Sequence, residues 1–486
     1  MVGCRWGRAT VSQLLPPPPR IAAMLDPRAR RDLERAVGKE RVLTRPADLA
    51  AYAYDAYGAS GERRLADAVV FPTTTDAVSR AVHACAHHGL PVVPRGAGTG
   101  YAAGAVATRG GVVVNLCRMN RVLEVDPGRS RLRAEAGAVT AAIHRRAEAA
   151  GLYYPPDPGS ATTSTIGGNV ACDAAGPHAL RYGATADHLC GATAVLGDGR
   201  IVTLGEGGDP SPLLPLLAAS EGTLAVITEV LLRLIPAPAA RVTLGARFAG
   251  MEGAAAAVAE ITRRGIVPAA LEFLDRSAVD AVAHAGVSDV EPGAALVLVE
   301  LEGGDAAAVG AEADSVVEAL EAAGGGAVSP ASDAAEVARL WAVRKAVSAA
   351  VATIMVGKVN EDVVVPRDRI AELVARTEEI GARHAVPVVN FGHLGDGNLH
   401  VTFLVDPRRP GERAHGDAAA EDLFEAVLGM GGSLSGEHGV GTTKLAYAGR
   451  QLGAGGADLM RRLKSRYDPA GRLNPGIKLP APTQAS

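Results

Sequence analysis

The stretch PVVPRGAGTGYAAGAV, residues 91–106, decides which fold the first half of the chain adopts. It follows a strand-like run, and Gly98, Gly100 and Ala103 satisfy the G-x-G-x-x-A pattern of a Rossmann dinucleotide site. That fold needs a long amphipathic helix next, whereas further glycines lead here into a new strand at Val112. The stretch therefore predicts a nest of backbone N–H groups that binds a pyrophosphate outside a Rossmann fold. A flexible loop without a ligand is the alternative.

The neighbouring segments predict a mixture of strands and helices. Residues 26–58 are predicted to be helical and polar, and a helix N-capped by Thr75 separates two strands. Residues 192–204 predict a hairpin around Asp198 and Gly199. Further strands are expected at 111–116, 121–126 and 131–137.

A second unit is expected to begin near Arg241, because Pro236 and Pro238 interrupt the preceding strand-like run. It alternates apolar strands with alanine-rich helices at 253–264 and 305–323. This pattern predicts an α+β layer with helices packed on one face of a sheet.

The composition limits the classes of function. The 486 residues are 48% hydrophobic and 21% charged, with a net charge of −4, which predicts a soluble globular chain that does not bind nucleic acid. No apolar run is long enough to predict a membrane span, and residues 1–24 lack the features of a signal peptide. Five scattered cysteines without a C-x-x-C pair favour a reducing compartment, the cytoplasm, with peripheral attachment to the inner face of the membrane left open.

A second loop, within residues 153–183, is also rich in potential donors. Ser164, Thr165, Gly168 and Asn169 expose hydroxyl and backbone groups in a segment without clear periodicity. A segment of this length is uncommon in a compact domain unless it surrounds a ligand. Two such loops favour a large phosphate-bearing cofactor over a single phosphate.

Charged side chains in the second half are candidates for substrate binding. The helical stretch 340–351 places Arg344 and Ser348 on one face, and Lys358 lies in the strand-like run that follows. An arginine of this kind can clamp a substrate carboxylate with two hydrogen bonds. A surface salt bridge is the alternative interpretation.

Two histidines and a glutamate form a candidate metal site. His393 and His400 flank the turn GDGN, and Glu437 and His438 lie between glycines further along. Two imidazoles and a carboxylate with free coordination positions suit a catalytic metal. The H-x6-H spacing alone leaves structural histidines equally plausible.

The strings VPRGAGTG, PPDPGSATTSTIGGNVA, SEGTLAVITE, FGHLGDGNLH, SGEHGVG and LNPGIK occur in this order. Together they resemble the FAD-linked oxidases of the vanillyl-alcohol-oxidase type, in the branch of D-lactate dehydrogenase, the glycolate oxidase FAD subunit and D-2-hydroxyglutarate dehydrogenase. The resemblance implies an α+β fold with a PCMH-type FAD-binding domain of two subdomains. An α+β substrate or cap domain and a C-terminal segment that returns to the flavin follow. The implied ranges are 1–40 for an extension and helix, 41–237 for the FAD-binding domain and 238–480 for the cap domain.

The resemblance also implies roles for individual residues. His438 would be the catalytic base, Arg344, Ser348 and Lys358 would lie at the substrate carboxylate, and His393, His400 and Glu437 would bind a divalent metal such as Zn, Mn or Fe. The residues implied in FAD binding are Pro94, Arg95, Gly96, Ala97, Gly98, Thr99, Gly100, Pro156, Asp157, Ser164, Thr165, Gly168, Asn169, Gly176, Glu221, Gly222, Ile227 and Asn474.

Some positions depart from the family pattern. Cys172 and Asp173 stand where relatives often have Glu-Asn, and Thr402 stands where some have an asparagine. The loop 94–104 has no His or Cys for covalent attachment, so FAD is expected to be non-covalent.

The implied reaction is oxidation of a D-2-hydroxy acid to a 2-oxo acid, with a hydride passing to the flavin while the metal polarises the hydroxyl. The electrons would pass to a quinone, a cytochrome, a flavoprotein or a partner subunit. A non-catalytic FAD-binding electron-transfer subunit of a multi-subunit oxidase is the alternative. The hydroxy acid and the oligomeric state stay open, with a homodimer among the options.

Overall fold

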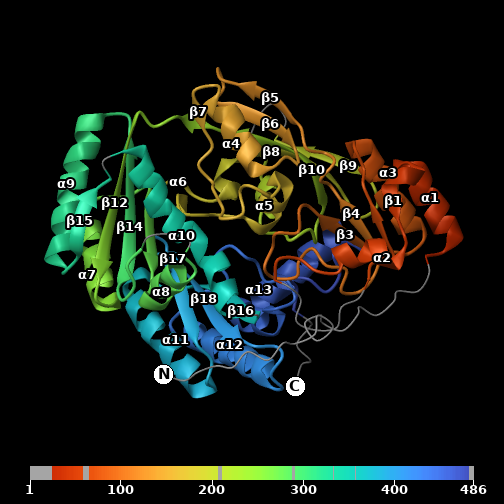
Figure 1. The fold of residues 1–486 in the computed structure, drawn as a ribbon. Coiled ribbons are helices and arrows are strands. Elements are labelled where there is room, and N and C mark those ends of the chain that lie inside the picture. The colour runs from red at the N-terminus through yellow and green to blue at the C-terminus, as the bar shows by residue number, and fades with distance from the viewer. Residues whose placement is uncertain are drawn as a thin grey trace.

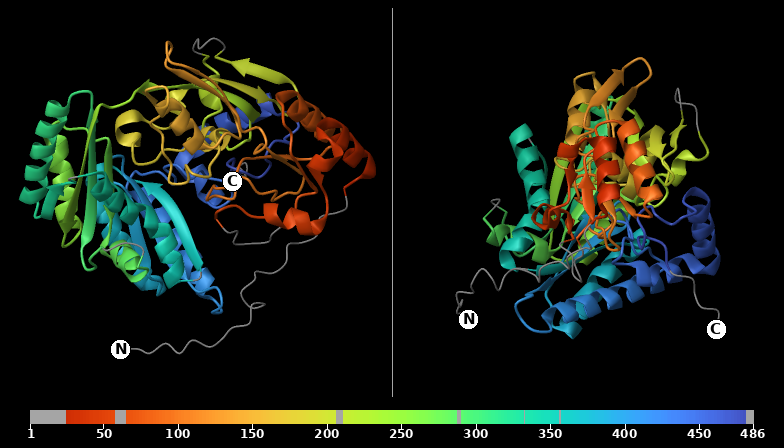
Figure 2. Two further views of the ribbon diagram at one scale, coloured as in Figure 1. Left: turned by 45° about the horizontal axis from the view of Figure 1, so that its top comes forward. Right: turned by 90° about the vertical axis from the view of Figure 1, so that its right-hand side faces the viewer.

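A computed structural model describes residues 25–57, 65–205, 211–286, 290–331, 333–355 and 357–480. The extension expected at residues 1–24 lies outside these ranges. The described chain forms three larger sheets and a two-stranded one, with helices around them (Figure 1). In the left view of Figure 2, the first two sheets (red to yellow-green) lie on one side and the third, with its helices (green to light blue), on the other. The predicted α+β class is confirmed.

The first sheet has the order β1-β2-β4-β3, and β4 pairs in parallel with both β2 and β3. Thr74, not the predicted Thr75, caps the helix between β2 and β3, because its Oγ1 accepts the N–H of Ala77 at 3.1 Å. The predicted helix does not run unbroken through 26–58, since Gly38 ends α1 with φ +97° and a strand follows before α-helix returns at Pro46–Leu49. The elements are α1 (Pro27–Val37), β1 (Val42–Leu43), α2 (Pro46–Leu49), β2 (Ala68–Val70), α3 (Thr75–His87), β3 (Val92–Arg95) and β4 (Val112–Asn115).

The second sheet is antiparallel, in the order β5-β6-β10-β8-β9. The predicted hairpin is confirmed: β8 pairs with β9, and Gly199 adopts φ +92° between them. The first two sheets share one hydrophobic core, which includes Val78 of α3 and Val226 of β10. The elements are β5 (Val122–Asp126), β6 (Arg131–Glu135), α4 (Thr140–Glu148), β7 (Leu152–Tyr153), α5 (Ile166–Cys172), α6 (Ala179–Tyr182), β8 (Leu189–Val195), β9 (Ile201–Leu204), β10 (Val226–Arg233) and β11 (Ile235–Pro236).

The third sheet has seven antiparallel strands in the order β15-β12-β14-β13-β17-β18-β16. Helices cover both of its faces, so the prediction of helices on one face is wrong: α7, α9, α11 and α12 share one core, and α8 and α10 share another. Strands β13 and β18 are consequently buried at every position. The elements are β12 (Ala240–Phe248), α7 (Met251–Arg263), β13 (Ala270–Leu274), α8 (Arg276–His284), β14 (Ala295–Gly303), α9 (Ala306–Ala322), β15 (Gly326–Pro330), α10 (Ala334–Ile354), β16 (Gly357–Val364), α11 (Ile370–His384), β17 (Val388–His393), β18 (Asn398–Val405) and α12 (Glu412–Gly429).

The chain returns to the first sheet after α13 (Leu445–Tyr467). Leu473 forms a parallel bridge with Val92, and the N–H of Asn474 donates to the carbonyl of Val92 at 2.8 Å. The predicted C-terminal return is therefore confirmed, since this segment pairs alongside β3, the strand that leads into the glycine loop. No helix in the described ranges is long and apolar enough to cross a bilayer.

Candidate active site

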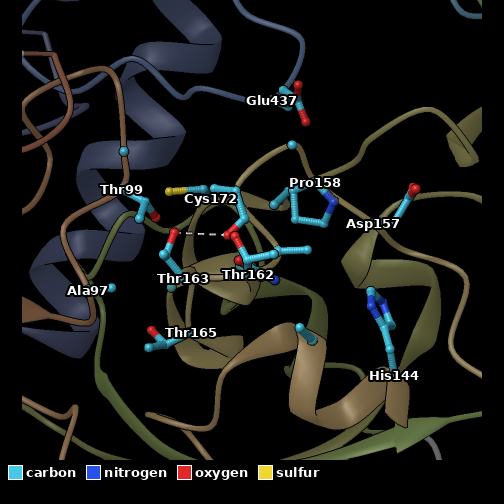
Figure 3. Close-up of a pocket in the computed structure, with 18 of the residues that line it drawn as sticks. Ala97, Thr99, His144, Asp157, Pro158, Thr162, Thr163, Thr165, Cys172 and Glu437 are labelled. Atoms are coloured by element: carbon cyan, nitrogen blue, oxygen red, sulfur yellow. Dashed lines mark hydrogen bonds between the residues drawn. The ribbon is translucent and has the colours of Figure 1, made fainter. Parts of the chain in front are cut away.

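A cavity of about 1200 Å³ is lined by residues from both halves of the chain (Figure 3). This volume exceeds the roughly 300–1,000 Å³ of ordinary small-molecule pockets, so a large cofactor and a substrate both fit. Most of the predicted site residues border it. Five others are not among the residues that line it, namely Pro156, Ser164, Gly176, Lys358 and Asn474.

The glycine loop after β3 forms one wall and continues to β4 without a helix, as the rejection of a Rossmann site requires. A Cβ on Gly96 would lie 2.1 Å from Oγ1 of Thr165, so the two donor-rich loops touch where glycine is required. Oγ1 of Thr165 is buried without a hydrogen-bond partner among the described residues. These two features fit a cofactor held between the loops.

Arg95 supports this loop from behind. Its guanidinium donates to the carbonyl oxygens of Tyr54 at 2.9 Å and Ala105 at 3.0 Å, and it packs on the ring of Tyr52. The side chain of Arg95 is therefore occupied by protein contacts. The backbone of the loop is what remains for an anion.

The turn between His393 and His400 forms the opposite end of the cavity. His393 ends β17, and His400 is the third residue of β18. The register pairs Phe391 with His400 and His393 with Asn398, so both imidazoles lie on the same face of the hairpin. A Cβ on Gly397, at φ +84°, would lie 2.1 Å from the carbonyl oxygen of Val365, so this turn requires glycine.

Glu437 completes a group of three potential metal ligands. Its Oε1 lies 3.7 Å from Nε2 of His393 and 3.5 Å from Nε2 of His400. Ligand atoms about 2.1 Å from a tetrahedral ion are roughly 3.4 Å apart, so the spacing fits a single cation. All three side chains are at most 11% exposed, which keeps competing water away.

The charges in this group have physical causes. Burial, assisted by the positive charge of His438, lowers the pKa of His400 to about 3, which leaves its imidazole neutral. Burial would also lower the pKa of His393, but the carboxylates of Glu272 and Glu437 raise it to about 10. Burial would raise the pKa of Glu437, but the neighbouring imidazole of His393, with those of His400 and His438, lowers the pKa of that carboxyl to about 2.

His438 lies beside these ligands in a stack of rings. Its ring is stacked on His400 at 5.2 Å and on Tyr101 at 4.9 Å, and its Nδ1 lies 3.4 Å from Oδ1 of Asp362. Tyr101 belongs to the glycine loop, so the stack joins the two ends of the cavity. The sequence offered no signal for Tyr101 beyond its place in that loop.

Two buried carboxylates hold the loop that carries Glu437 and His438. Oδ2 of Asp362 accepts the N–H groups of Gly436, Glu437 and His438 at 2.7, 2.7 and 2.9 Å. The carboxylate of Glu221 accepts those of Val440 at 2.9 Å and Gly441 at 2.7 Å. The side chain of Glu221, predicted to contact the cofactor, is thus directed at this loop.

Arg344 lies on α10 with its side chain 12% exposed. Its Nε–H donates to Oε2 of Glu272 at 2.6 Å, and its guanidinium covers the ring of Phe391. The surface salt bridge weighed from the sequence is therefore not what the structure has: the partner is a fully buried carboxylate. Sequence analysis missed Glu272, although a glutamate inside the apolar run ALEFL was the available signal.

Ser348 and Lys358 meet near Arg344. The ammonium of Lys358 donates to Oγ of Ser348 at 3.1 Å and lies 5.7 Å from the centre of the Tyr101 ring. Burial lowers the pKa of Lys358. The structure thus brings the three predicted carboxylate-binding residues to one side of the cavity.

A second cluster that could hold a cation contains His178, Glu300 and Glu302. Its oxygens are already occupied, because Arg241 pairs with both glutamates and Tyr182 donates to Glu302 at 3.0 Å. We therefore interpret it as an ion-pair network between the two halves. The charges of Asp157 and Glu300 outweigh burial and raise the pKa of His178 well above its ordinary value.

Cys172 borders the cavity as a free thiol (Figure 3). Burial raises its pKa to about 12, so the thiol is protonated at neutral pH. The other described cysteines, Cys85, Cys117 and Cys190, are also free, as their spacing predicted.

Known proteins resemble the whole of this architecture. A family model described as FAD binding domain matches residues 66–205, and one described as FAD linked oxidases, C-terminal domain, matches residues 237–477. Glycolate oxidase subunit GlcD of Bacillus subtilis (strain 168) is 35% identical over 432 residues, which cover 87% of this chain and 91% of GlcD. D-lactate dehydrogenase of Anaerostipes hadrus is 35% identical over 423 residues, covering 84% and 89%. The crystal structure of substrate-bound p-cresol methylhydroxylase superimposes with a TM-score of 0.76 at 17% identity, covering 93% and 96%, and so shares the fold.

Proposed function

The chain belongs to the FAD-linked oxidases, and from this premise we propose that it oxidises a D-2-hydroxy acid to the 2-oxo acid. It is an FAD-linked oxidoreductase, and relatives named for glycolate and D-lactate support 2-hydroxy acids as donors. The substrate class, the metal and the residue roles below belong to the proposal.

The observation that carries the proposal is the arrangement at one end of the cavity. The imidazoles of His393 and His400 converge on Glu437, and Arg344 joins the same group through Glu272. A 2-hydroxy acid carries a carboxylate next to a hydroxyl, which are the two groups that an arginine and a metal-binding triad recognise.

FAD would lie between the two donor-rich loops without a covalent bond. Backbone N–H groups of residues 96–100 and the hydroxyl of Thr165 would hold it, and Asn169, Gly222 and Ile227 also line the cavity there. When bound, FAD supplies the acceptor for the hydride of the substrate. The protein contributes position and polarity.

A divalent cation such as Zn, Mn or Fe would be held by His393, His400 and Glu437. When bound, it supplies the Lewis acid that lowers the pKa of the substrate hydroxyl. His438 then lies next to the ligand set, where it can take the hydroxyl proton. Arg344, with Ser348 and Lys358 close by, would fix the substrate carboxylate. In this proposal the substrate would lose a proton to His438 and a hydride, with its two electrons, to the flavin.

The electrons then need an acceptor, for which we propose a quinone, a cytochrome, a flavoprotein or a partner subunit. A relative named as a subunit, covered over 91% of its length, favours the second candidate function, an FAD-binding electron-transfer subunit of a multi-subunit glycolate oxidase. We place either form in the cytoplasm, at the inner face of the membrane when the acceptor is a quinone.

Anaerobic mixing of the purified yellow protein with D- and L-2-hydroxy acids tests the proposal. We expect rapid loss of the oxidised flavin absorbance with one D-2-hydroxy acid and much slower loss with its L-enantiomer. If no acid bleaches the flavin, the substrate assignment is wrong and the electron-transfer subunit is favoured. Bleaching that is unchanged after complete removal of metal would overturn the metal role.

A further inference from the structure

Glu272 lies in the middle of β13, inside the third sheet, and its side chain is fully buried. The register of β13 and β17 pairs it directly with His393, so both side chains lie on the same face. Its Oε1 lies 2.5 Å from Nδ1 of His393, and its Oε2 lies 2.6 Å from Nε of Arg344. One buried carboxylate therefore contacts residues from both parts of the proposed site.

We propose that Glu272 is a positioning residue that orients the metal ligand His393 and the carboxylate-binding Arg344 together. The inference rests on the proposed function, because it assigns to Glu272 the joint alignment of the two groups that would hold a hydroxy acid. Glu272 itself touches neither substrate nor metal in this scheme.

The contact with His393 selects the tautomer of its imidazole. A metal requires the neutral imidazole, which carries one proton, and because the carboxylate of Glu272 can only accept, that proton is on Nδ1. Nε2 is then the nitrogen that can coordinate, and Nε2 is the atom that faces Glu437 at 3.7 Å. Carboxylates that accept from a ligating histidine fix its ring in this way.

The contact with Arg344 selects the direction of its guanidinium. Glu272 occupies Nε, and neither Nη atom donates a hydrogen bond to any of the described residues. The plane of the guanidinium rests on Phe391, 5.0 Å from the ring centre. Two terminal N–H donors are therefore aligned and free, which is what a bidentate grip on a carboxylate requires.

An amide in place of this carboxylate cannot satisfy both partners. In Glu272→Gln one oxygen remains to accept, and the new NH₂ group faces a second donor. Either Arg344 loses its alignment or His393 turns to the tautomer whose protonated Nε2 cannot bind a metal. The amide can adopt either orientation, so each molecule loses one of the two contacts and both functions should weaken in the ensemble.

The test compares Glu272→Gln with Asp275→Asn in protein from which the metal has been removed while FAD stays bound. Asp275 is the matched control: it is a buried carboxylate directly after the same strand, and it holds the N–H of Asn390 at 2.8 Å and that of Ala278 at 2.6 Å. The affinity for added Zn²⁺ is measured by competition with a chromophoric chelator, and KM for the hydroxy acid is measured after reloading.

We expect Glu272→Gln to weaken Zn²⁺ binding about 10- to 100-fold and to raise KM, with FAD content unchanged. Asp275→Asn should lower thermal stability without changing Zn²⁺ affinity, and Glu272→Asp, which keeps the charge, should recover part of both losses. Wild-type Zn²⁺ affinity in Glu272→Gln, or an equal loss in Asp275→Asn, would overturn the inference.

The failure of the proposed function has a different signature. A wild-type protein that binds Zn²⁺ but reduces its flavin with no hydroxy acid refutes the substrate assignment, while the Zn²⁺ affinities still judge the role of Glu272 at His393. A wild-type protein that binds no Zn²⁺, Mn²⁺ or Fe²⁺ at all overturns both the metal site and the inference.

Discussion

Asp362→Asn should lower both the thermal stability of the protein and its rate of flavin reduction, for two different physical reasons. The carboxylate of Asp362 is fully buried, accepts three consecutive N–H groups of the loop 436–438, and pairs with the ammonium of Lys444, which is 1% exposed. Lys444, the loop N–H groups and His438 together outweigh burial and hold the pKa of Asp362 well below its ordinary value. The asparagine would keep the shape and one accepting oxygen but lose the charge.

The expected loss of stability comes from the ammonium that stays behind. Removing one partner of a buried ion pair costs about 3–5 kcal/mol. For a domain of this size, 1 kcal/mol corresponds to roughly 2–4 °C in Tm, so the variant should melt about 6–20 °C lower. Turnover should fall for another reason, because a displacement of His438 by about 1 Å can cost roughly 100-fold.

The double variant Asp362→Asn/Lys444→Met tells the two effects apart. It contains no unpaired ammonium, so most of the lost Tm should return, while flavin reduction by the hydroxy acid should stay slow. Lys444 also lies 3.6 Å from Oε2 of Glu361, a carboxyl whose pKa burial raises to about 7. Thermal unfolding and stopped-flow flavin reduction are therefore measured at pH 6, where Glu361 of the wild type is mostly protonated and does not pair with the ammonium. If the double variant regains wild-type reduction rates, Asp362 does not position the loop. If the single variant melts at the wild-type temperature, the buried pair of Asp362 and Lys444 does not contribute the expected free energy of unfolding.

Four further predictions concern single residues. His393→Ala should abolish metal binding, measured by elemental analysis, and turnover, while FAD stays bound; a metal-free variant that is still active would contradict the ligand role. His438→Asn should slow flavin reduction about 10²- to 10⁴-fold with metal and FAD retained, and an unchanged rate would exclude it as the base. Arg344→Lys keeps a positive charge beside Glu272 but loses the two terminal donors, so kcat/KM should fall mainly through KM; equal kinetics would return Arg344 to a structural role. Burial raises the pKa of Glu361 to about 7, so the folded state holds this proton more tightly than the unfolded state. The free energy of unfolding should therefore decrease as the pH rises from about 4.5 to 7. Glu361→Gln should reduce this decrease, measured by urea unfolding at several pH values, and an unchanged pH dependence would refute the raised pKa of Glu361.

The glycine and histidine motifs could be predicted from the sequence because they are local. The loop around Gly98 and the turn between His393 and His400 each lie within one short segment, where residue type and spacing carry the information. Glu272 and Asp362 could not be assigned, because their partners lie 72 to 121 and 73 to 82 residues away in the chain. A charged residue inside a buried strand indicates a partner but does not say which one.

The third sheet illustrates the same limit at the level of packing. Alternating strands and helices predicted helices on one face, but residues 295–302 of β14 are buried without alternation. A strand buried at every position needs cover on both sides. The apolar run 295–299 was therefore evidence for the second layer, which is formed by α8 and by α10, the helix that carries Arg344.

The glycines of SGEHGVG acquire a reason once both carboxylates are considered. A Cβ on Gly436 would lie 2.5 Å from the amide of Asn398, and one on Gly441 would lie within 2 Å of the carbonyl oxygen of Ala102 in the glycine loop. The loop is thus held by Asp362 from the third sheet and by Glu221 from the first half, at distances that exclude side chains. These glycines are required because neighbouring atoms lie too close for a side chain, and not because the loop has to be flexible. Because the loop is fixed from both halves at once, the ligand and base it carries keep their positions only while the two halves stay in contact.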